Sequence, residues 1–293
     1  MNRRRFLTIA AAALAAPAFA APAQAAEAAI WTGRALGSDA RIILHGAGPH
    51  QARSVFRRVE RELTRIEGHF SLHAESALTR LNRDGCLPHP TPEITAVFAL
   101  AGRVHSATGG VFDPTIQPLW LALATGEDAE AARRHIGWHR VRATDAEIRL
   151  DPGMALTFNG IAQGHAADRI ATLLRDQGFG NVLIDMGEVM ALGLAGSRPW
   201  TAAIADPDGR ELARTALSDR ALATSSPRGT LIGAEAAHIL HPSGRPPLWS
   251  TLAVSAPDAA TADALSTAFC LMDRAAIDAA LTAFPDAKVE VLI

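Results

Sequence analysis

The pattern of apolar and polar positions predicts helices in the first half of the chain. Between residues 51 and 66, apolar side chains recur every three or four positions among Arg and Glu, which is the spacing of an amphipathic helix. A second helix is predicted from 93 to about 107, ending at Gly109 and Gly110, because glycine stops a helix readily. A third is predicted from about 162 to 177, before Gly178.

Short apolar runs separated by turn residues follow the third helix and predict β-strands, several of them antiparallel. These runs are residues 182–184, 202–204, 221–223, 238–240, 252–254 and 289–293. Helical spacing returns at 261–272 and at 274–281. The chain is therefore expected to adopt an α+β fold, with mixed, largely antiparallel sheets flanked by helices.

The first residues have the layout of a secretory signal. Arg3, Arg4 and Arg5 precede an Ala-rich apolar stretch that ends near residue 16. Paired arginines before Phe-Leu resemble a twin-arginine export signal, with cleavage after Ala20 or Ala25. An uncleaved membrane anchor or a buried N-terminal helix is the alternative, but the run is shorter than the roughly 20 residues that span a bilayer. We expect residues 1–25 to be a signal peptide, residues 27–293 one domain, and the protein to be periplasmic.

The net charge and the number of cysteines limit the kind of partner and the kind of covalent cross-linking that we expect. Without the three arginines of the signal, 25 of the 28 Lys and Arg face 30 Asp and Glu, a net charge of −5. That balance argues against a nucleic-acid partner, which requires a basic face. Cys86 and Cys270 are too few for a disulfide framework. They either pair in an oxidising compartment or remain two isolated thiols.

A helix in the C-terminal part carries a candidate metal site. Asp263 and Thr267 stand one helical turn apart, and therefore on the same face. A carboxylate and a hydroxyl so placed can share a hard cation such as Mg²⁺, which takes oxygen ligands and completes its shell with water and substrate phosphates. The alternative interpretation is that Asp263 caps or solvates a surface helix.

Several glycine-rich or turn-rich segments are candidates for ligand binding. In residues 159–168, two glycines precede a predicted helix, whose exposed N–H groups can face an anion. An ordinary tight turn explains the same segment, which lacks the dinucleotide fingerprint. Residues 110–115, 183–188 and 223–226 likewise place Asp, Glu, Ser or Thr beside turn formers at the ends of apolar runs. Ordinary turns also have this composition.

His238 lies in the apolar run 236–240 and is either a buried structural histidine or a catalytic one. The chain has no Cys/His pair at the spacing of zinc ligands. It also lacks the G-x-S-x-G elbow of many serine hydrolases.

Taken in order, six motifs resemble the FAD:protein FMN transferase family, known as ApbE. They are GVFDPTIQPLW, NGIAQGHAAD, IDMGE, ATSS, HILHPSG and ADALSTAF, within a resemblance that runs from about residue 36 to 272. Leu36-Gly37-Ser38 stands where the family usually has Met-Gly-Thr. Its twin-arginine signal makes the chain similar to the exported branch of the family, which serves nitrous oxide respiration.

The resemblance implies a reaction and a set of site residues. The FMN half of FAD would be transferred to a Thr or Ser hydroxyl of an acceptor protein, such as a membrane-bound electron-transfer subunit, with release of AMP. His238 and Asp263 would be catalytic, with His238 as a base or as a donor that orients phosphate. The implied Mg²⁺ ligands are Gly160, Asp263, Ser266 and Thr267. The implied FAD-binding residues are Leu36, Gly37, His73, Val111, Phe112, Asp113, Gln163, Asp168, Thr224, Ser225 and His238.

The chain departs from the family pattern around the flavin. His73 and His165 stand where the family has Tyr, and Gln163 replaces a frequent Lys. Ala77 replaces a Glu, and His241 replaces the Asp of the family's H-I-I-D-P pattern. We therefore expect modest FAD affinity and lower activity at acidic pH, where the additional histidines become charged. Two alternative functions remain open: an FAD pyrophosphatase that yields FMN and AMP, and a periplasmic flavin-binding protein without catalysis.

Overall fold

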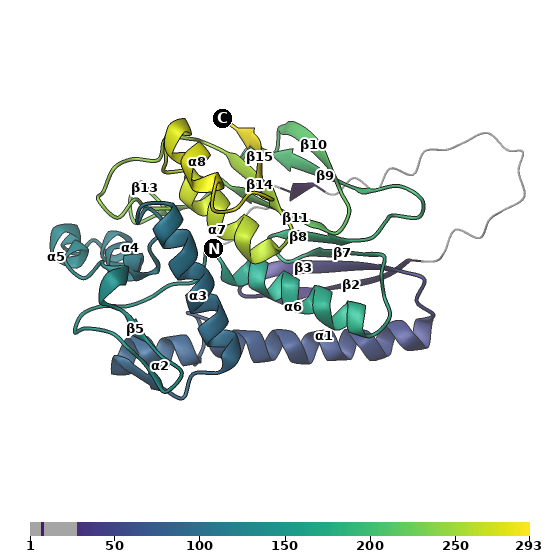
Figure 1. Ribbon diagram of the computed structural model, residues 1–293, viewed down its shortest axis with the longest axis horizontal. Coiled ribbons are helices and arrows are strands. Elements are labelled where there is room, and N and C mark those ends of the chain that lie inside the picture. The colour runs from purple at the N-terminus through teal and green to yellow at the C-terminus, as the bar shows by residue number, and fades with distance from the viewer. Residues whose placement is uncertain (1–6, 9–27) are drawn as a thin grey trace, which may run out of the picture.

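The computed structural model describes residues 7–8 and 28–293, and its centre is a seven-stranded sheet (Figure 1). Apart from Leu7–Thr8 (β1), the expected signal peptide lies outside the described residues. All neighbouring strands of the sheet are antiparallel, in the order β15-β14-β11-β8-β7-β3-β2. Their bounds are Ala28–Ala35 (β2), Ser38–His45 (β3), Val182–Asp185 (β7), Val189–Leu192 (β8), Arg220–Ser225 (β11), Leu252–Ala256 (β14) and Lys288–Leu292 (β15).

Three helices cover one face of this sheet (Figure 1). They are α1 (Pro49–Phe70), α6 (Ala162–Asp176) and α7 (Ala259–Phe269), with α6 between the other two. Their apolar faces and one face of the sheet form the main hydrophobic core. None of the helices among the described residues is both long enough and apolar enough to span a membrane.

The opposite face of the sheet is covered by a hairpin of β9 (Trp200–Ala205) and β10 (Glu211–Leu217). β1 pairs with β9 on the edge opposite β10. A second, smaller core forms here, in which Leu183 and Leu222 of the sheet meet Trp200 and Ile204 of the hairpin. Because side chains alternate along a strand, Val182 and Ile184 belong to the main core while Leu183 belongs to the second. Burial on both faces explains why β7 is apolar without interruption.

The longest helix, α1, shows how local sequence specifies an element. Pro49 occupies the first turn, where a missing N–H costs nothing, and Gly48 precedes it. The buried positions of α1 recur every three or four residues and face the sheet and α6. These are Ala52, Val55, Val59, Leu63, Ile66 and Phe70. The helix ends at Ser71, whose backbone is extended.

The segment between α1 and α6 packs at one end of the helical layer. Its longest element is α3 (Pro92–Ala107), which packs against α7 and α8 (Arg274–Leu281). The other elements are α2 (Ala77–Asp84), β4 (Cys86–Pro88), η1 (Pro114–Ile116), α4 (Gln117–Thr125), α5 (Ala129–Arg133), η2 (Trp138–Arg140), β5 (Arg142–Ala143) and β6 (Glu147–Arg149). A short hairpin of β12 (Leu231–Ile232) and β13 (Ala236–Ala237) packs on α4.

The α+β fold and the helices predicted at 51–66, 93–107, 162–177, 261–272 and 274–281 are confirmed, with ends that differ by a few residues at most of them. Five of the six predicted strands are also present. The strand predicted at 238–240 is wrong. β13 ends at Ala237, and the three residues that follow line a cavity instead of pairing with a strand. There the backbone N–H of His238 donates to the Pro227 carbonyl at 3.0 Å instead of to a strand partner.

Cys86 and Cys270 do not pair in the structure, so both are free thiols. Cys270 is buried, and its thiol donates to the Ser225 carbonyl at 3.5 Å. Burial raises the pKa of the Cys270 thiol, since the thiolate would lose its hydration. Cys270 is therefore a core residue and not a reactive thiol.

Candidate active site

A cavity of about 280 Å³ opens where the ends of β7 and β11 meet the start of α6 and the middle of α7. Five carboxylates line it, together with His238, and none of the described lining residues is Lys or Arg. The carboxylates are Asp39, Asp113, Asp185, Glu188 and Asp263. Apolar side chains, including Ile116, Trp120 and Leu240, form another part of the wall. The cavity thus combines oxygen ligands for a cation with an apolar surface for a planar ring.

Asp263 and Thr267 of α7 both line the cavity, as their spacing on one helical face requires. The Asp263 side chain is 3% exposed, and its Oδ2 accepts the backbone N–H of Gly164 at 3.1 Å. Gly160 lies against Thr267, because a Cβ built on Gly160 would be 2.9 Å from Thr267 Oγ1. Three of the four expected metal ligands therefore come together at the cavity wall.

Ser266, the fourth expected metal ligand, does not line the cavity. Its hydroxyl is fully buried, lies 2.8 Å from Ser225 Oγ, and donates to the Asp263 carbonyl at 3.0 Å. On a helix, Ser266 points about 100° away from Thr267, toward β11. It thus ties α7 to β11, and its role as a metal ligand stays a prediction.

His238 lines the cavity directly after β13. Its Nδ1 lies 3.1 Å from the Thr230 carbonyl oxygen, which can only accept a hydrogen bond. Nδ1 therefore carries a hydrogen, and whenever the ring is neutral the lone pair is on Nε2. That tautomer suits a proton acceptor.

Leu36 and His73 meet in a small adjoining cavity of about 10 Å³. Leu36 and Gly37 form the two-residue turn between β2 and β3, with φ of 48° and 83°. Such a turn requires positive φ at both positions, which strains a residue such as Leu. The Leu36 N–H donates to Glu67 Oε1 at 3.0 Å, and Gly37 lies beside the His73 ring.

Gln163 connects the small cavity to the large one, since it lines both together with Asn159. Its Nε2 donates to Ser38 Oγ at 2.5 Å. Gly187 packs against the Gln163 side chain, and a Cβ added to Gly187 would be 3.0 Å from Gln163 Nε2. Expected ligand-binding residues on the β2–β3 turn and on α6 are thus brought together.

Val111, Phe112 and Asp113 line the opposite part of the large cavity. Asp113 also caps η1, since its Oδ1 accepts from the Thr115 N–H at 2.8 Å and from the Thr115 hydroxyl at 2.5 Å. The carboxylate therefore holds the loop in place as well as facing the cavity.

Asp168, expected to bind FAD, lies outside both cavities. Its two oxygens accept the backbone N–H groups of Ala259 and Ala260 at 2.7 and 2.9 Å. Burial raises the pKa of Asp168 to about 7, although these two hydrogen bonds lower it. Asp168 faces the positive end of α7 and caps that helix. Its role in flavin binding stays a prediction.

Glu188 and Asp185 of the IDMGE motif also line the cavity, although neither was chosen as a site residue from sequence. Glu188 is 7% exposed, and burial with the nearby charges of Asp263 and Asp185 raises its pKa well above the ordinary value. The turn after an apolar run was the available signal. It could not show that the Glu188 side chain points inward.

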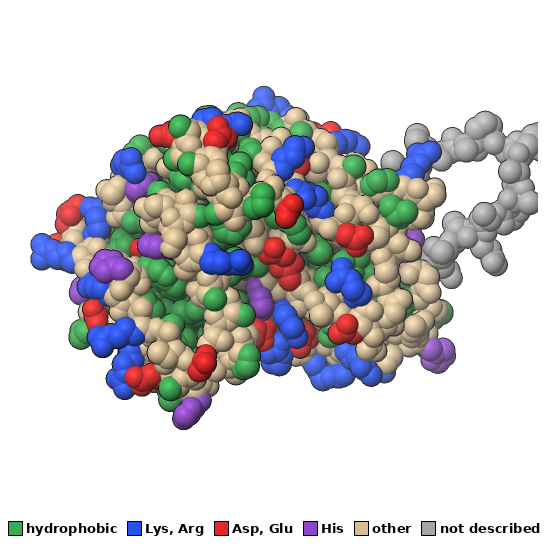
Figure 2. Space-filling view, viewed as in Figure 1, with side chains coloured by type: hydrophobic (Ala, Val, Ile, Leu, Met, Phe, Trp, Pro, Cys, Tyr) green, Lys and Arg blue, Asp and Glu red, His purple; other side chains and the backbone are tan. Residues whose placement is uncertain are grey.

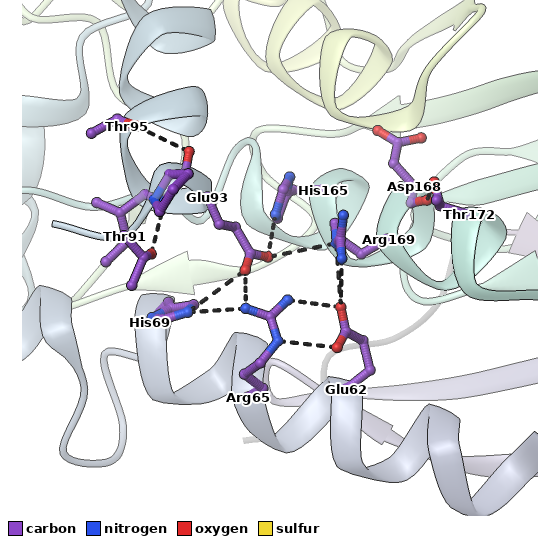
Figure 3. A network of polar contacts seen from close by, with 12 residues as sticks. Glu62, Arg65, His69, Thr91, Glu93, Thr95, His165, Asp168, Arg169 and Thr172 are labelled. Carbon is purple, nitrogen blue, oxygen red and sulfur yellow. Dashed lines mark hydrogen bonds and ion pairs between the residues drawn. The ribbon is translucent and has the colours of Figure 1, made fainter. Parts of the chain in front are cut away.

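A network of polar side chains joins α1, α3 and α6 (Figure 3). Glu93, at the start of α3, faces Arg65 and His69 of α1 and His165 of α6. Burial raises the pKa of Glu93, but hydrogen bonds from His165 and Arg65 outweigh it and lower the pKa to about 2. The His165 ring packs edge-on against Phe70, which lines the small cavity, at a centroid distance of 5.6 Å. The network therefore supports that wall.

Comparison with known proteins points to a single family. Residues 36–293 match the sequence model of the ApbE family. The FAD:protein FMN transferase of Salmonella typhimurium strain LT2 is 26% identical over 275 residues, which cover 84% of this chain and 79% of that protein. The protein of the same name from Escherichia coli strain K12 is 24% identical over 276 residues, with the same coverage.

Solved structures share the fold. The ApbE protein of Thermotoga maritima superposes with a TM-score of 0.78 and 25% identity, over 91% of this chain and 94% of that one. The flavin transferase ApbE from Vibrio cholerae gives a TM-score of 0.77 and 24% identity, over 88% and 91% of the two chains.

Proposed function

Because the chain belongs to the ApbE family, we propose that it is an FAD:protein FMN transferase that flavinylates a Thr or Ser of an acceptor protein. The acceptor hydroxyl oxygen would bond to the phosphorus on the FMN side of FAD. The bond from that phosphorus to the bridging oxygen would break, and AMP would leave with the electron pair. The observation that carries this proposal is one cavity that collects Asp263, Thr267, Gly160 and His238.

The chemistry of the donor set fits Mg²⁺. The cavity offers carboxylate and hydroxyl oxygens, and no cationic Lys or Arg among its described lining residues. Asp263 and Thr267 would hold the ion together with the Gly160 carbonyl, and water and phosphate oxygens would complete its shell. When bound, Mg²⁺ neutralises charge on the diphosphate and on the departing phosphate. Without it, five carboxylates would repel a dianionic diphosphate.

His238 would accept the proton of the acceptor hydroxyl. Its Nδ1–H is held by the Thr230 carbonyl, which orients the ring and leaves the lone pair on Nε2. An imidazole held in this way can act as a general base. The apolar wall with Trp120 and Leu240 would accommodate the planar flavin ring.

The exported location is part of the proposal. Arg3, Arg4 and Arg5 before an Ala-rich stretch support twin-arginine export to the periplasm, where the acceptor would be encountered. An electron-transfer subunit anchored in the membrane, within nitrous oxide respiration, is the acceptor that we propose. Because twin-arginine export carries folded proteins, the enzyme could fold before it crosses the membrane.

The test is to incubate the mature protein with FAD, Mg²⁺ and a candidate acceptor. We expect a covalently fluorescent acceptor and an equal amount of AMP. The Asp263→Asn variant should lose both products, whereas Glu127→Gln, an exposed side chain on the loop after α4, should keep them. FMN and AMP released equally with and without acceptor would instead identify an FAD pyrophosphatase. Bound FAD without turnover would identify a carrier.

A further inference from the structure

Glu188 is a buried carboxylate in the cavity wall that the proposed reaction does not use. It occupies the turn between β7 and β8, is 7% exposed, and lines the large cavity. The nearby backbone N–H of Thr224 favours the ionised form of this carboxyl. Its Oε2 has no hydrogen-bond partner among the described residues. A buried carboxylate oxygen without a partner is rare, because losing hydration is costly.

The hydroxyl of Thr224 is in the same situation. Its Oγ1 is buried and has no hydrogen-bond partner in the described part of the chain, and Thr224 also lines the cavity. Two unsatisfied oxygens therefore belong to residues that line the same cavity. The Glu188 carboxylate oxygen and the Thr224 hydroxyl oxygen can both coordinate a hard cation. A hydrogen-bond acceptor in their place could satisfy only the hydroxyl, because an ionised carboxylate has no hydrogen to donate.

The surrounding charges favour a cation at this position. Asp263 and Asp185 both act electrostatically on Glu188, and both line the same cavity. No Lys or Arg among the described lining residues offsets these charges. Carboxylates that line one cavity of low dielectric repel one another, and a cation among them would offset that repulsion.

We propose that Glu188 supplies a second carboxylate, beside Asp263, to the divalent cation of this cavity, with the Thr224 hydroxyl as a neighbouring ligand. The inference rests on the proposed function, because it enlarges the same cation site. Its ligands would come from three separate parts of the chain: the β7–β8 turn, the end of β11, and α7.

A second carboxylate has a consequence for the order of binding. A site with Asp263 as its only charged ligand would hold Mg²⁺ weakly until phosphate oxygens arrive, since Mg²⁺ usually relies on substrate phosphates. With Glu188 added, the protein would bind the cation in the absence of FAD. The diphosphate of FAD would then enter a cavity whose negative charge is already reduced.

The experiment is a titration of the FAD-free mature protein with Mn²⁺, followed by the electron paramagnetic resonance signal of the free ion. We expect wild type to bind Mn²⁺ without FAD and Mg²⁺ to compete. The Glu188→Gln variant, which keeps the shape but removes the charge, should bind Mn²⁺ roughly tenfold more weakly or worse. Glu188→Asp should keep part of the affinity, and the exposed control Glu127→Gln should match wild type.

Thermal unfolding of each variant without cation checks that it folds. Cation-induced stabilisation should be present in wild type and lost in Glu188→Gln. Unchanged Mn²⁺ affinity in Glu188→Gln would overturn the inference, as would a variant that loses FAD affinity but keeps Mn²⁺ affinity. If Asp263→Asn abolishes Mn²⁺ binding while Glu188→Gln does not, only this inference fails. If neither change weakens Mn²⁺ binding and flavin transfer proceeds without Mg²⁺, the proposed magnesium site itself fails.

Discussion

The Asp263 carboxylate accepts the backbone N–H of Gly164 at 3.1 Å, which joins the middle of α7 to the first turn of α6. The two helices can approach this closely because residue 164 lacks a side chain. A Cβ at Gly164 would lie 2.2 Å from the Ala259 carbonyl oxygen. The position of the proposed metal ligand therefore depends on a glycine in another helix.

Replacing Gly164 with Ala should disturb both stability and the site. We expect α6 and α7 to move apart, at a cost of about 1–3 kcal/mol in unfolding free energy, with weaker cation binding. Gly68→Ala is the matched control, because that α1 position has open space around it and Ala favours helix. Chemical denaturation and Mn²⁺ titration measure the two effects. Equal stability of the two variants would contradict the close-packing argument.

Thr267 should contribute to the cation site through its hydroxyl. The Thr267→Val variant keeps the shape against Gly160, so we expect proper folding but a roughly tenfold or greater increase in the Mg²⁺ concentration needed for flavin transfer. Thr267→Ser, which retains the oxygen, should stay close to wild type. The Mg²⁺ dependence of acceptor fluorescence distinguishes them, and two identical curves would remove Thr267 from the ligand set.

Asp168 should matter for stability and not for flavin binding. Asp168→Ala leaves the N–H groups of Ala259 and Ala260 without their cap, at a cost of about 1 kcal/mol or more. FAD affinity measured well below the unfolding temperature should be unchanged. If instead Asp168→Ala loses FAD affinity while its melting temperature is unaffected, the flavin-binding role implied by the family resemblance would be restored.

Glu93 should make stability depend on acid pH. The pKa of Glu93 is 4.5 in the unfolded chain and about 2 in the folded protein. Between these two pH values Glu93 is therefore ionised in the folded protein and protonated in the unfolded chain. Its contribution is therefore complete above about pH 4.5 and lost as the pH falls toward 2. We expect Glu93→Gln to unfold at lower temperature than wild type at pH 7, with a difference that shrinks between pH 4.5 and 2. Calorimetry at several pH values tests this, and a constant difference would contradict it.

The histidines at the small cavity and behind it lead to a separate prediction. His73 lines the small cavity, and His165 supports the wall of that cavity by packing against Phe70. At positions 73 and 165 the family pattern has Tyr. We expect His73→Tyr to tighten FAD binding, because a larger ring stacks over more of the flavin. Fluorescence titration with FAD from pH 5.5 to 8 measures both affinity and its pH dependence. Tight wild-type binding that is flat over this range would contradict the expectation of modest, acid-sensitive affinity.

Figure 2 shows acidic and basic side chains interspersed over the viewed face, in keeping with a chain whose acidic residues slightly outnumber its basic ones. That charged side chains lie at the surface follows from the cost of burying a charge and needs no knowledge of the fold. The same holds for the helices: periodic burial of α1 follows from 3.6 residues per turn and needs no knowledge of its partners.

The sequence by itself determined that Asp263 and Thr267 share a face, because helical spacing is local geometry. The sequence also has glycine at positions of close packing such as Gly164, but it does not show which segment packs there. Only the tertiary structure decided that Ser266 turns toward Ser225 and that Asp168 caps α7. It alone decided, too, that Glu188 points into the cavity. Each of these depends on contacts with elements distant in sequence, and a side chain's direction relative to such an element is set by packing, which no local pattern encodes.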